Sequence, residues 1–164
     1  MVFHLRSYTN ADRDAVNSVA LSAFAQYSHA FDDWATFSKK IGNMAVLAES
    51  GEIIVAEAGG EIRGAVAYLG PGRPKSAFFK PDWPVMRMLV VHPSSRGFGI
   101  GRRLADECIQ FAIRDNARLF ALHTTKIMSV ALGMYERMGF VFHREAPAIH
   151  GVPYGIYVKE LPPA

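Results

Sequence analysis

The stretch 92-HPSSRGFGIG-101 carries three glycines among its last five residues, and it lies between an apolar run and an apolar helical pattern. A strand that passes into a helix through such a loop leaves backbone N–H groups unpaired at the positive end of the helix. Gly97, Gly99 and Gly101 carry no Cβ, so a phosphate can approach their backbone closely. The stretch therefore predicts an anion site. A glycine-rich turn that only lets a strand meet a helix is the alternative.

Two other phosphate-binding motifs do not fit this stretch. A dinucleotide fingerprint, G-x-G-x-x-G, would end at Arg102 or Leu104 if it started at Gly97 or Gly99, and the Gly-Lys-Ser/Thr of a P-loop is absent. Arg102 and Arg103 are a second, independent indication of an anion site at this helix start. Cations in the first turn of a helix oppose its dipole, and a bound anion relieves that repulsion.

The composition is that of one globular domain. The chain has 164 residues, 50% of them hydrophobic and 20% charged, which suits a single core and one domain over 1–164. The net charge of +3 is mild and has no long run of one sign, so it favours anionic ligands. Arg96, Arg102 and Arg103 form no extended basic stripe with interleaved aromatic residues, and we expect no nucleic-acid partner.

Cysteine usage and the N-terminal segment bear on the compartment. Cys108 is the only cysteine, which excludes an internal disulfide framework and a cysteine-built metal site and favours a reducing environment. The first residues, MVFHLRSYTN, lack the features of a secretory signal, and no apolar run is long enough to span a membrane. We therefore expect a cytoplasmic protein without a membrane partner.

Hydrophobic periods of two and of 3.6 residues alternate along the chain, which predicts an α/β fold around one sheet. Strands are expected at 2–9, in both halves of 52–69, and at 84–91, 118–124, 140–145 and 154–161. Helices are expected after Asp12, from Trp34, at 101–115 and at 128–138. The expected order is βααβββαβαββ. Residues 70–82 contain three prolines and two glycines, which indicates a long surface loop.

Two helix starts carry capping residues. Thr9 and Asp12 have the spacing of a capping box. Asp32 or Asp33 is placed to cap the helix that starts at Trp34, and the same carboxylates are candidates for holding a cationic amine. Capping is the simpler interpretation.

The sequence resembles the GNAT superfamily of acyl-CoA-dependent N-acetyltransferases. The core motif of that family, Gln/Arg-x-x-Gly-x-Gly/Ala after an apolar strand, is matched by 96-RGFGIG-101. A second signature has an Asn, an Ala three residues on, then a Tyr and a Gly-Phe pair. The segment 128-MSVALGMYERMGF-140 supplies Ala131, Tyr135, Gly139 and Phe140. The resemblance implies the GNAT fold, a mixed central sheet of about seven strands that is splayed between strands 4 and 5 and flanked by about four helices.

The resemblance also implies acetyl-CoA as cosubstrate and no metal. Its pyrophosphate would lie on the backbone amides from Arg96 to Arg102, and its pantetheine arm would pair with the strand at Leu89 to Val91 as an added strand. The implied coenzyme-binding residues are Leu89, Val90, Val91, Arg96, Gly97, Phe98, Gly99, Ile100, Gly101 and Arg102.

Two residues are candidates for catalysis. Tyr135 matches the family tyrosine whose hydroxyl donates a proton to the coenzyme sulfur, and a core tyrosine is the alternative. The base is less clear, because the fourth strand offers only Val85 and Arg87 where relatives carry a carboxylate. His123 occupies a fifth-strand position where some members have a glutamate, and histidine titrates near neutral pH. A structural histidine, with a water chain as base, is the alternative.

One position departs from the family pattern. Met128 stands where the second signature has Asn, and a thioether cannot make the hydrogen bonds of a side-chain amide. Thr125, Lys126 or Ser129 are candidates to replace that contact.

The implied activity is direct transfer of an acetyl group from acetyl-CoA to a primary amine of a small molecule or protein, through a ternary complex. A catalytically silent acyl-CoA-binding or sensing module is the alternative, favoured by Met128 and by the missing strand carboxylate. The sequence does not identify the acceptor amine. Phe78, Phe79 and Trp83 either wall an apolar pocket or anchor the long loop on the core. Many relatives form dimers, so a homodimer is one expected assembly.

Overall fold

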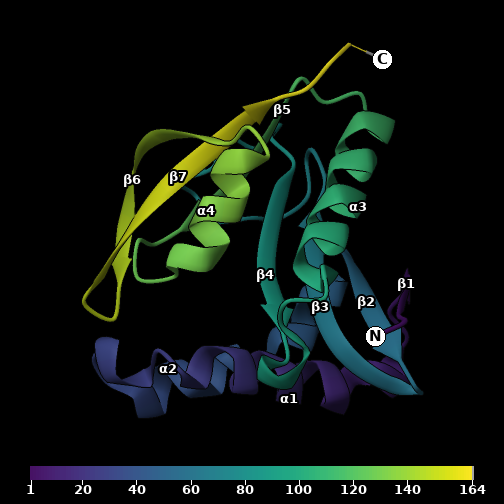
Figure 1. Ribbon diagram of the computed structural model, residues 1–164. Coiled ribbons are helices and arrows are strands. Elements are labelled where there is room, and N and C mark those ends of the chain that lie inside the picture. Colours follow the sequence, from purple (N-terminus) through teal and green to yellow (C-terminus); the bar gives the residue numbers. More distant parts are fainter. Residues whose placement is uncertain (164) are drawn as a thin grey trace.

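The computed structural model describes residues 1–163, and its helices and strands follow the expected order (Figure 1). The strands are β1 (His4–Ser7), β2 (Glu52–Ala58), β3 (Glu61–Leu69), β4 (Val85–Val91), β5 (Leu119–Thr124), β6 (Val141–Ile149) and β7 (Val152–Glu160). The α-helices are α1 (Arg13–Ala25), α2 (Trp34–Ile41), α3 (Ile100–Arg114) and α4 (Ser129–Arg137). Short 3-10 helices, which the sequence patterns did not predict, cover Asn10–Asp12, Ser28–Ala30, Met44–Glu49 and Pro93–Ser95.

The seven strands form one mixed sheet in the order β1-β2-β3-β4-β5-β7-β6. Only β4 and β5 run parallel, and their pairing is limited to Val85 opposite Ala121. Beyond this pair the two halves of the sheet diverge, as the ribbons of β4 and β7 show (Figure 1). The expected GNAT fold, with its splay between strands 4 and 5, is therefore confirmed.

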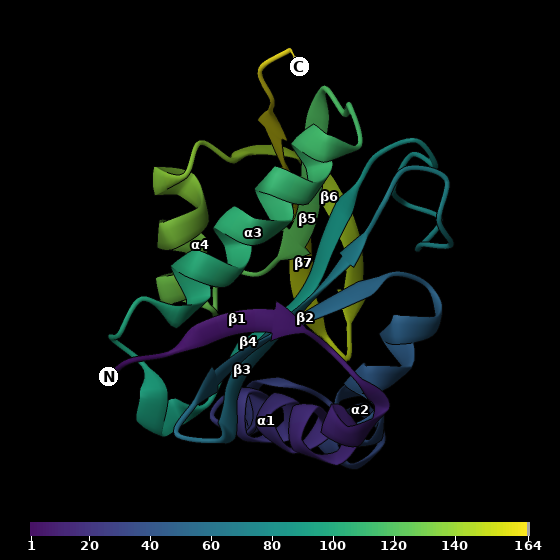
Figure 2. The same cartoon turned by 90° about the vertical axis from the view of Figure 1, so that its right-hand side faces the viewer.

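The helices cover the sheet on both faces, α3 and α4 on one and α1 and α2 on the other (Figure 2). Each face has its own apolar core, because successive side chains of a strand point to opposite faces. On β2, Ile54 packs into the core under α3 and α4, whereas Ile53 and Val55 pack into the core under α1 and α2. This alternation makes the central strands apolar on both faces.

A β-bulge interrupts β4 at Met88 and Leu89, within the part of β4 that no longer pairs with β5. Ala65 of β3 is opposite Val90 and Ala67 is opposite Arg87, so Met88 and Leu89 together face one residue of β3. Met88 has a positive φ of 56°, which is the left-handed region that bulges often use. The extra residue changes the alternation of side chains, and Arg87 and Met88 both line a cavity beside α2.

The helix caps agree with the sequence patterns. The carboxylate of Asp12 accepts the backbone N–H of Thr9 at 2.9 Å and pairs with Arg6 at 2.8 Å. Asp33 caps α2 by accepting the backbone N–H of Thr36 at 3.3 Å. Hydrogen bonding from the Thr36 side chain, and then from its backbone, lowers the pKa of the Asp33 carboxyl. Capping is thus the role that the structure gives to Asp33.

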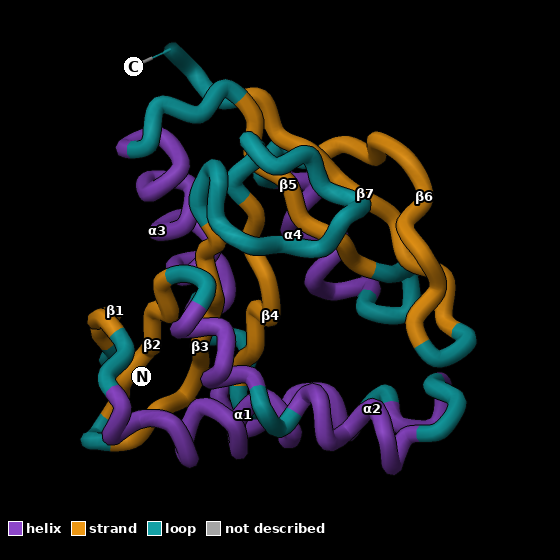
Figure 3. The backbone as a smooth tube through the Cα atoms, turned by 180° about the vertical axis from the view of Figure 1, so that it is seen from behind, coloured by secondary structure: helices purple, strands orange, loops and turns teal. Residues whose placement is uncertain are grey.

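The loop between β3 and β4 is anchored by its aromatic side chains and, in the view from behind, passes in front of β5 (Figure 3). Phe79 and Trp83 are buried in a small core with β-strand residues such as Val85 and Ala121, and Phe78 packs partly against it. Arg144 of β6 donates a hydrogen bond to the carbonyl of Phe78. The anchoring interpretation of these three aromatic residues therefore fits the structure.

The last hairpin is longer than the sequence pattern predicted. β6 continues past residue 145 to Ile149, and the hairpin tip at His150 and Gly151 reaches the segment before α2, where the N–H of Asp32 donates to the carbonyl of His150 at 2.7 Å. The sequence did not predict this extension because it contains Pro147, and proline is depleted in strands. β6 is an edge strand, and its register skips between Ala146 and Ile149, so the proline is accommodated there.

Candidate active site

The glycine loop leaves its backbone open. Gly97 and Gly99 have φ angles of 82° and 84°, and a Cβ added at either position would meet no atom within 4 Å. Gly99 is the N-cap of α3, where no side chain caps the helix. The first backbone N–H groups of α3 are therefore available to an anion, as the helix dipole favours.

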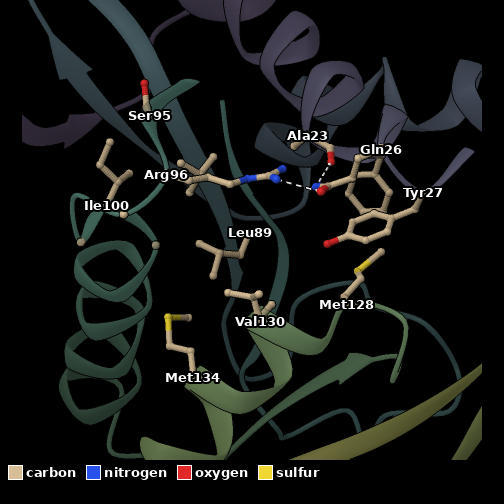
Figure 4. Close-up of a pocket in the computed structure, with 16 residues that line it drawn as sticks. Ala23, Gln26, Tyr27, Leu89, Ser95, Arg96, Ile100, Met128, Val130 and Met134 are labelled. Carbon is tan, nitrogen blue, oxygen red and sulfur yellow. Dashed lines mark hydrogen bonds between the residues drawn. The ribbon is translucent and has the colours of Figure 1, made fainter. Parts of the chain in front are cut away.

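A cavity of about 300 Å³ lies between this loop, the end of α1 and the start of α4; we call it the first cavity (Figure 4). Among the residues predicted to bind the coenzyme, those that line it are Leu89, Val91, Arg96, Gly97, Gly99, Ile100 and Gly101. Val90, Phe98 and Arg102 do not. Val90 is buried in the core under α1 and α2, Phe98 is 49% exposed, and the guanidinium of Arg102 lies 3.4 Å from the carboxylate of Asp106.

Two polar side chains beside the first cavity differ in their hydrogen bonding: Arg96 bonds a residue at the end of α1, and Ser95 has no partner in the described residues. Arg96 crosses toward α1 and donates to Gln26 Oε1 at 2.7 Å, and Gln26 in turn donates to the carbonyl of Ala23 at 2.9 Å (Figure 4). The Ser95 hydroxyl is fully buried and has no hydrogen-bond partner within the described residues. A buried hydroxyl without a partner is uncommon, and a ligand oxygen would satisfy it. The sequence patterns did not indicate Ser95 or Gln26.

A second cavity, of about 110 Å³, continues from the first. The two share the lining residues Phe24, Leu89, Met128 and Ala131. The titratable side chains that line the second cavity are Arg87, His123, Tyr135 and Tyr154. The structure therefore places both predicted catalytic residues, Tyr135 and His123, in the second cavity, which adjoins the cavity lined by the glycine loop.

Tyr135 lies on α4 and is 6% exposed. Its ring packs edge-on against Phe140, with 5.9 Å between the centroids. Burial raises the pKa of the Tyr135 hydroxyl well above its ordinary value, so the phenol keeps its proton at neutral pH. It can act as a proton donor in this cavity.

His123 lies on β5 and is surrounded by aromatic rings. The centroids of Phe78, Phe79 and Tyr154 lie 5.3, 5.7 and 5.3 Å from that of the imidazole. Desolvation and the nearby charge of Arg87 lower the pKa of His123 to about 4. Its Nδ1 is buried without a hydrogen-bond partner in residues 1–163. At pH 7 the imidazole is neutral and has a free nitrogen.

Met128 separates the first cavity from the second and lines both. It is the N-cap of α4, and its side chain lies near the Tyr27 ring (Figure 4). None of the candidate replacements for the family amide lines either cavity: Thr125 is buried elsewhere, and Lys126 and Ser129 are exposed. The passage between the two cavities is therefore apolar at this position.

A third cavity, of about 460 Å³, continues from the second on the side of α2. The two share Phe37, Ile41, Arg87, Met88 and Ile149. Its other walls come from the helix Met44–Glu49 and the β6–β7 hairpin, and Lys40, Asn43 and His150 supply polar groups. From the sequence, Arg87 was expected only to be unable to serve as a base. The one sequence feature that could have indicated a cavity-lining role for Arg87 is its position inside an otherwise apolar strand.

Comparisons with known proteins agree with this architecture. The model of the acetyltransferase (GNAT) family matches residues 15–140. A solved structure from Corynebacterium glutamicum, described as a histone acetyltransferase and related acetyltransferase, is 25% identical with a TM-score of 0.75, and the match covers 100% of this chain and 98% of that one.

Two further solved structures share the fold and were determined with coenzyme. A GNAT family acetyltransferase from Brucella melitensis, in complex with acetyl-CoA, is 22% identical with a TM-score of 0.67, over 99% of this chain and 90% of that one. PaiA N-acetyltransferase from Thermoplasma acidophilum, in complex with coenzyme A, is 16% identical with a TM-score of 0.78, over 98% of this chain and 100% of that one. Within residues 1–163, no helix is both long and apolar enough to cross a membrane.

Proposed function

Because the chain belongs to the GNAT acetyltransferase family, we propose that it transfers the acetyl group of acetyl-CoA directly to a primary amine while both substrates are bound. One observation carries the proposal. The first cavity, with its exposed glycine backbone, adjoins a second cavity that is lined by a proton donor, Tyr135, and a neutral nitrogen base, His123. Such a pair is what acyl transfer to an amine requires.

The residues of the first cavity fit the coenzyme. The backbone N–H groups at Gly97 to Gly101 and the partnerless hydroxyl of Ser95 suit the pyrophosphate. β4 has no pairing with β5 beyond Val85, so its edge at Leu89 and Val91 is free to hydrogen-bond the pantetheine arm as an added strand. When bound, acetyl-CoA supplies an acetyl group activated as a thioester.

Tyr135 and His123 divide the proton transfers. The Tyr135 hydroxyl donates a proton to the departing thiolate, and its raised pKa keeps that proton available at neutral pH. His123 accepts the proton that the amine nitrogen loses. No carboxylate lines the second cavity in the part of the chain that the structure describes, so His123 is the base that its lining offers. With a pKa of about 4 it is a weak base that is always in its accepting form at pH 7.

A coenzyme A release assay tests this function. Purified protein with acetyl-CoA is offered a panel of amino acids, polyamines, aminoglycosides, arylamines and peptides. We expect at least one amine to release coenzyme A, with double-reciprocal plots that intersect because both substrates bind before the reaction. Parallel plots would indicate a covalent acetyl-enzyme and contradict direct transfer.

The alternative of an acyl-CoA sensor is favoured by Met128, which leaves the passage between the cavities without a side-chain amide. Calorimetry separates the two functions. Saturable acetyl-CoA binding together with no coenzyme A release from any amine of the panel would support the sensor and overturn the enzyme.

A further inference from the structure

Arg87 is a partly buried arginine without a partner. Its Nε is shut off from solvent and makes no hydrogen bond, and no carboxylate within residues 1–163 lies within 4.0 Å of its guanidinium. The other arginines with low exposure differ, since Arg6 pairs with Asp12 and Arg63 pairs with Glu61. An enclosed charge without a counter-ion is costly, and its retention indicates a binding role.

The surroundings of Arg87 add to its positive charge and supply no compensation. Neither the second nor the third cavity has an Asp or Glu among its lining residues, whereas Lys40 lines the third. Asp32 lies near Gly151 and Asp33 near His150, and neither carboxylate lines the second or third cavity. Cavity walls that carry one sign of charge attract ligands of the opposite sign.

Arg87 lies where the proposed reaction site in the second cavity meets the third cavity. It lines both cavities, and Tyr135 and His123 line only the second. An acceptor whose nitrogen lies in the second cavity would therefore place its remainder toward the guanidinium and into the third. The planar guanidinium presents parallel N–H donors that match an oxyanion better than a single point charge does.

We propose that the acceptor is an amine that also carries an oxyanion, a carboxylate or a phosphate, and that Arg87 binds this group where the second and third cavities meet. The inference rests on the proposed acetyl transfer and narrows its substrate class. It disfavours polyamines, because their cationic chain would meet Arg87 and Lys40 with no carboxylate among the lining residues.

Matched pairs of acceptors test the inference. One arm compares the standard amino acids with their carboxamides, and the other compares amino sugars with and without a 6-phosphate, all by coenzyme A release. Both members of a pair carry the amine; we call the member with the carboxylate or phosphate the charged member and its counterpart without that group the neutral member. We expect at least one charged member to have a kcat/KM about tenfold or more above that of its neutral counterpart. The arm that shows the preference identifies the oxyanion. Equal or better use of the neutral members in both arms overturns the proposal.

Variants locate the preference at the guanidinium. Arg87→Met is expected to remove the preference for the charged member while leaving acetyl-CoA affinity unchanged, and Arg87→Lys to restore it only in part. Arg13→Met, at an exposed arginine on α1 that lines none of the three cavities, is the matched control. If Arg87→Met lowers kcat/KM for charged and neutral members by the same factor, Arg87 has only a structural role and the proposal is wrong.

A binding experiment separates this inference from the proposed function. If no amine releases coenzyme A, acetyl transfer fails, and calorimetry of the same pairs on protein loaded with coenzyme A then decides about Arg87. Tighter binding of charged members, lost in Arg87→Met, supports the oxyanion site by itself. Undetectable or equal binding of both members overturns it.

Discussion

Arg87 and His123 face each other across the splay, Arg87 on β4 and His123 on β5, and both line the second cavity. Burial lowers the pKa of the His123 imidazole, and the charge of Arg87 lowers it further, to about 4. The residue proposed to bind the acceptor and the residue proposed to accept its proton are thus coupled electrostatically.

This coupling predicts how activity depends on pH. If His123 is the base, kcat/KM has an acidic limb with an apparent pKa near 4, because protonation below that pH removes the accepting nitrogen. Arg87→Met removes a positive charge, so protonation of His123 becomes easier and the limb moves to higher pH. The measurement is kcat/KM from pH 3.5 to 8 with a neutral acceptor. His123→Ala should abolish the limb, and an unchanged limb in that variant would exclude His123 as the base.

The same pKa predicts a change in stability. A histidine that is protonated less readily in the folded protein than in the unfolded chain stabilises the fold above its ordinary pKa of 6.5, and this contribution is lost as the pH falls toward 4. The difference between these pKa values corresponds to about 3 kcal/mol at most. Urea unfolding at pH 7 and at pH 4 should show the free energy of unfolding of the wild type falling relative to that of His123→Leu. A constant difference between the two proteins would contradict the buried, neutral state of His123.

Two phenols in one cavity allow a matched test of the proton donor. Tyr135 and Tyr154 both line the second cavity, but only Tyr135 belongs to the second family signature. Tyr135→Phe is expected to lower kcat by about 10²-fold or more, since it removes general acid catalysis, with little change in acetyl-CoA affinity. Tyr154→Phe should retain most of the activity. Unchanged kcat for Tyr135→Phe at saturating substrates would remove its proposed role.

Much of the fold could be predicted from local patterns. The alternation of β2 and β3 around Gly59 and Gly60, and the apolar stripe of α3, are set by which residues are near in sequence, so periodicity finds them. The glycine loop is recognisable for the same reason, since its function lies in the missing side chains of a continuous segment. The element order followed from these segments and was confirmed.

The contents of the second and third cavities depend on contacts between distant segments. Nothing in 85-VMRMLVV-91 marks Met88 as the residue with a positive φ, because methionine has no preference for that conformation. The surroundings of His123 come from the loop before β4 and from β7, and the third cavity needs α2 and the tip of the last hairpin to meet. Such placements follow from packing of the whole sheet, which no local pattern encodes.

The glycine loop itself gives the last prediction. Gly99→Val is expected to abolish detectable acetyl-CoA binding in calorimetry, because its Cβ and methyl groups would occupy the open space over the first turn of α3 that the pyrophosphate needs. The substitution also strains the backbone at φ 84°. Gly60→Val is the control for that strain: Gly60 has a φ of 78°, nothing lies within 4 Å of its Cβ position, and it belongs to the β2–β3 turn away from the cavities. Both variants should lose similar thermal stability, and only Gly99→Val should lose the coenzyme. Acetyl-CoA binding that survives in Gly99→Val, or is lost equally in Gly60→Val, would show that the loop backbone does not hold the pyrophosphate.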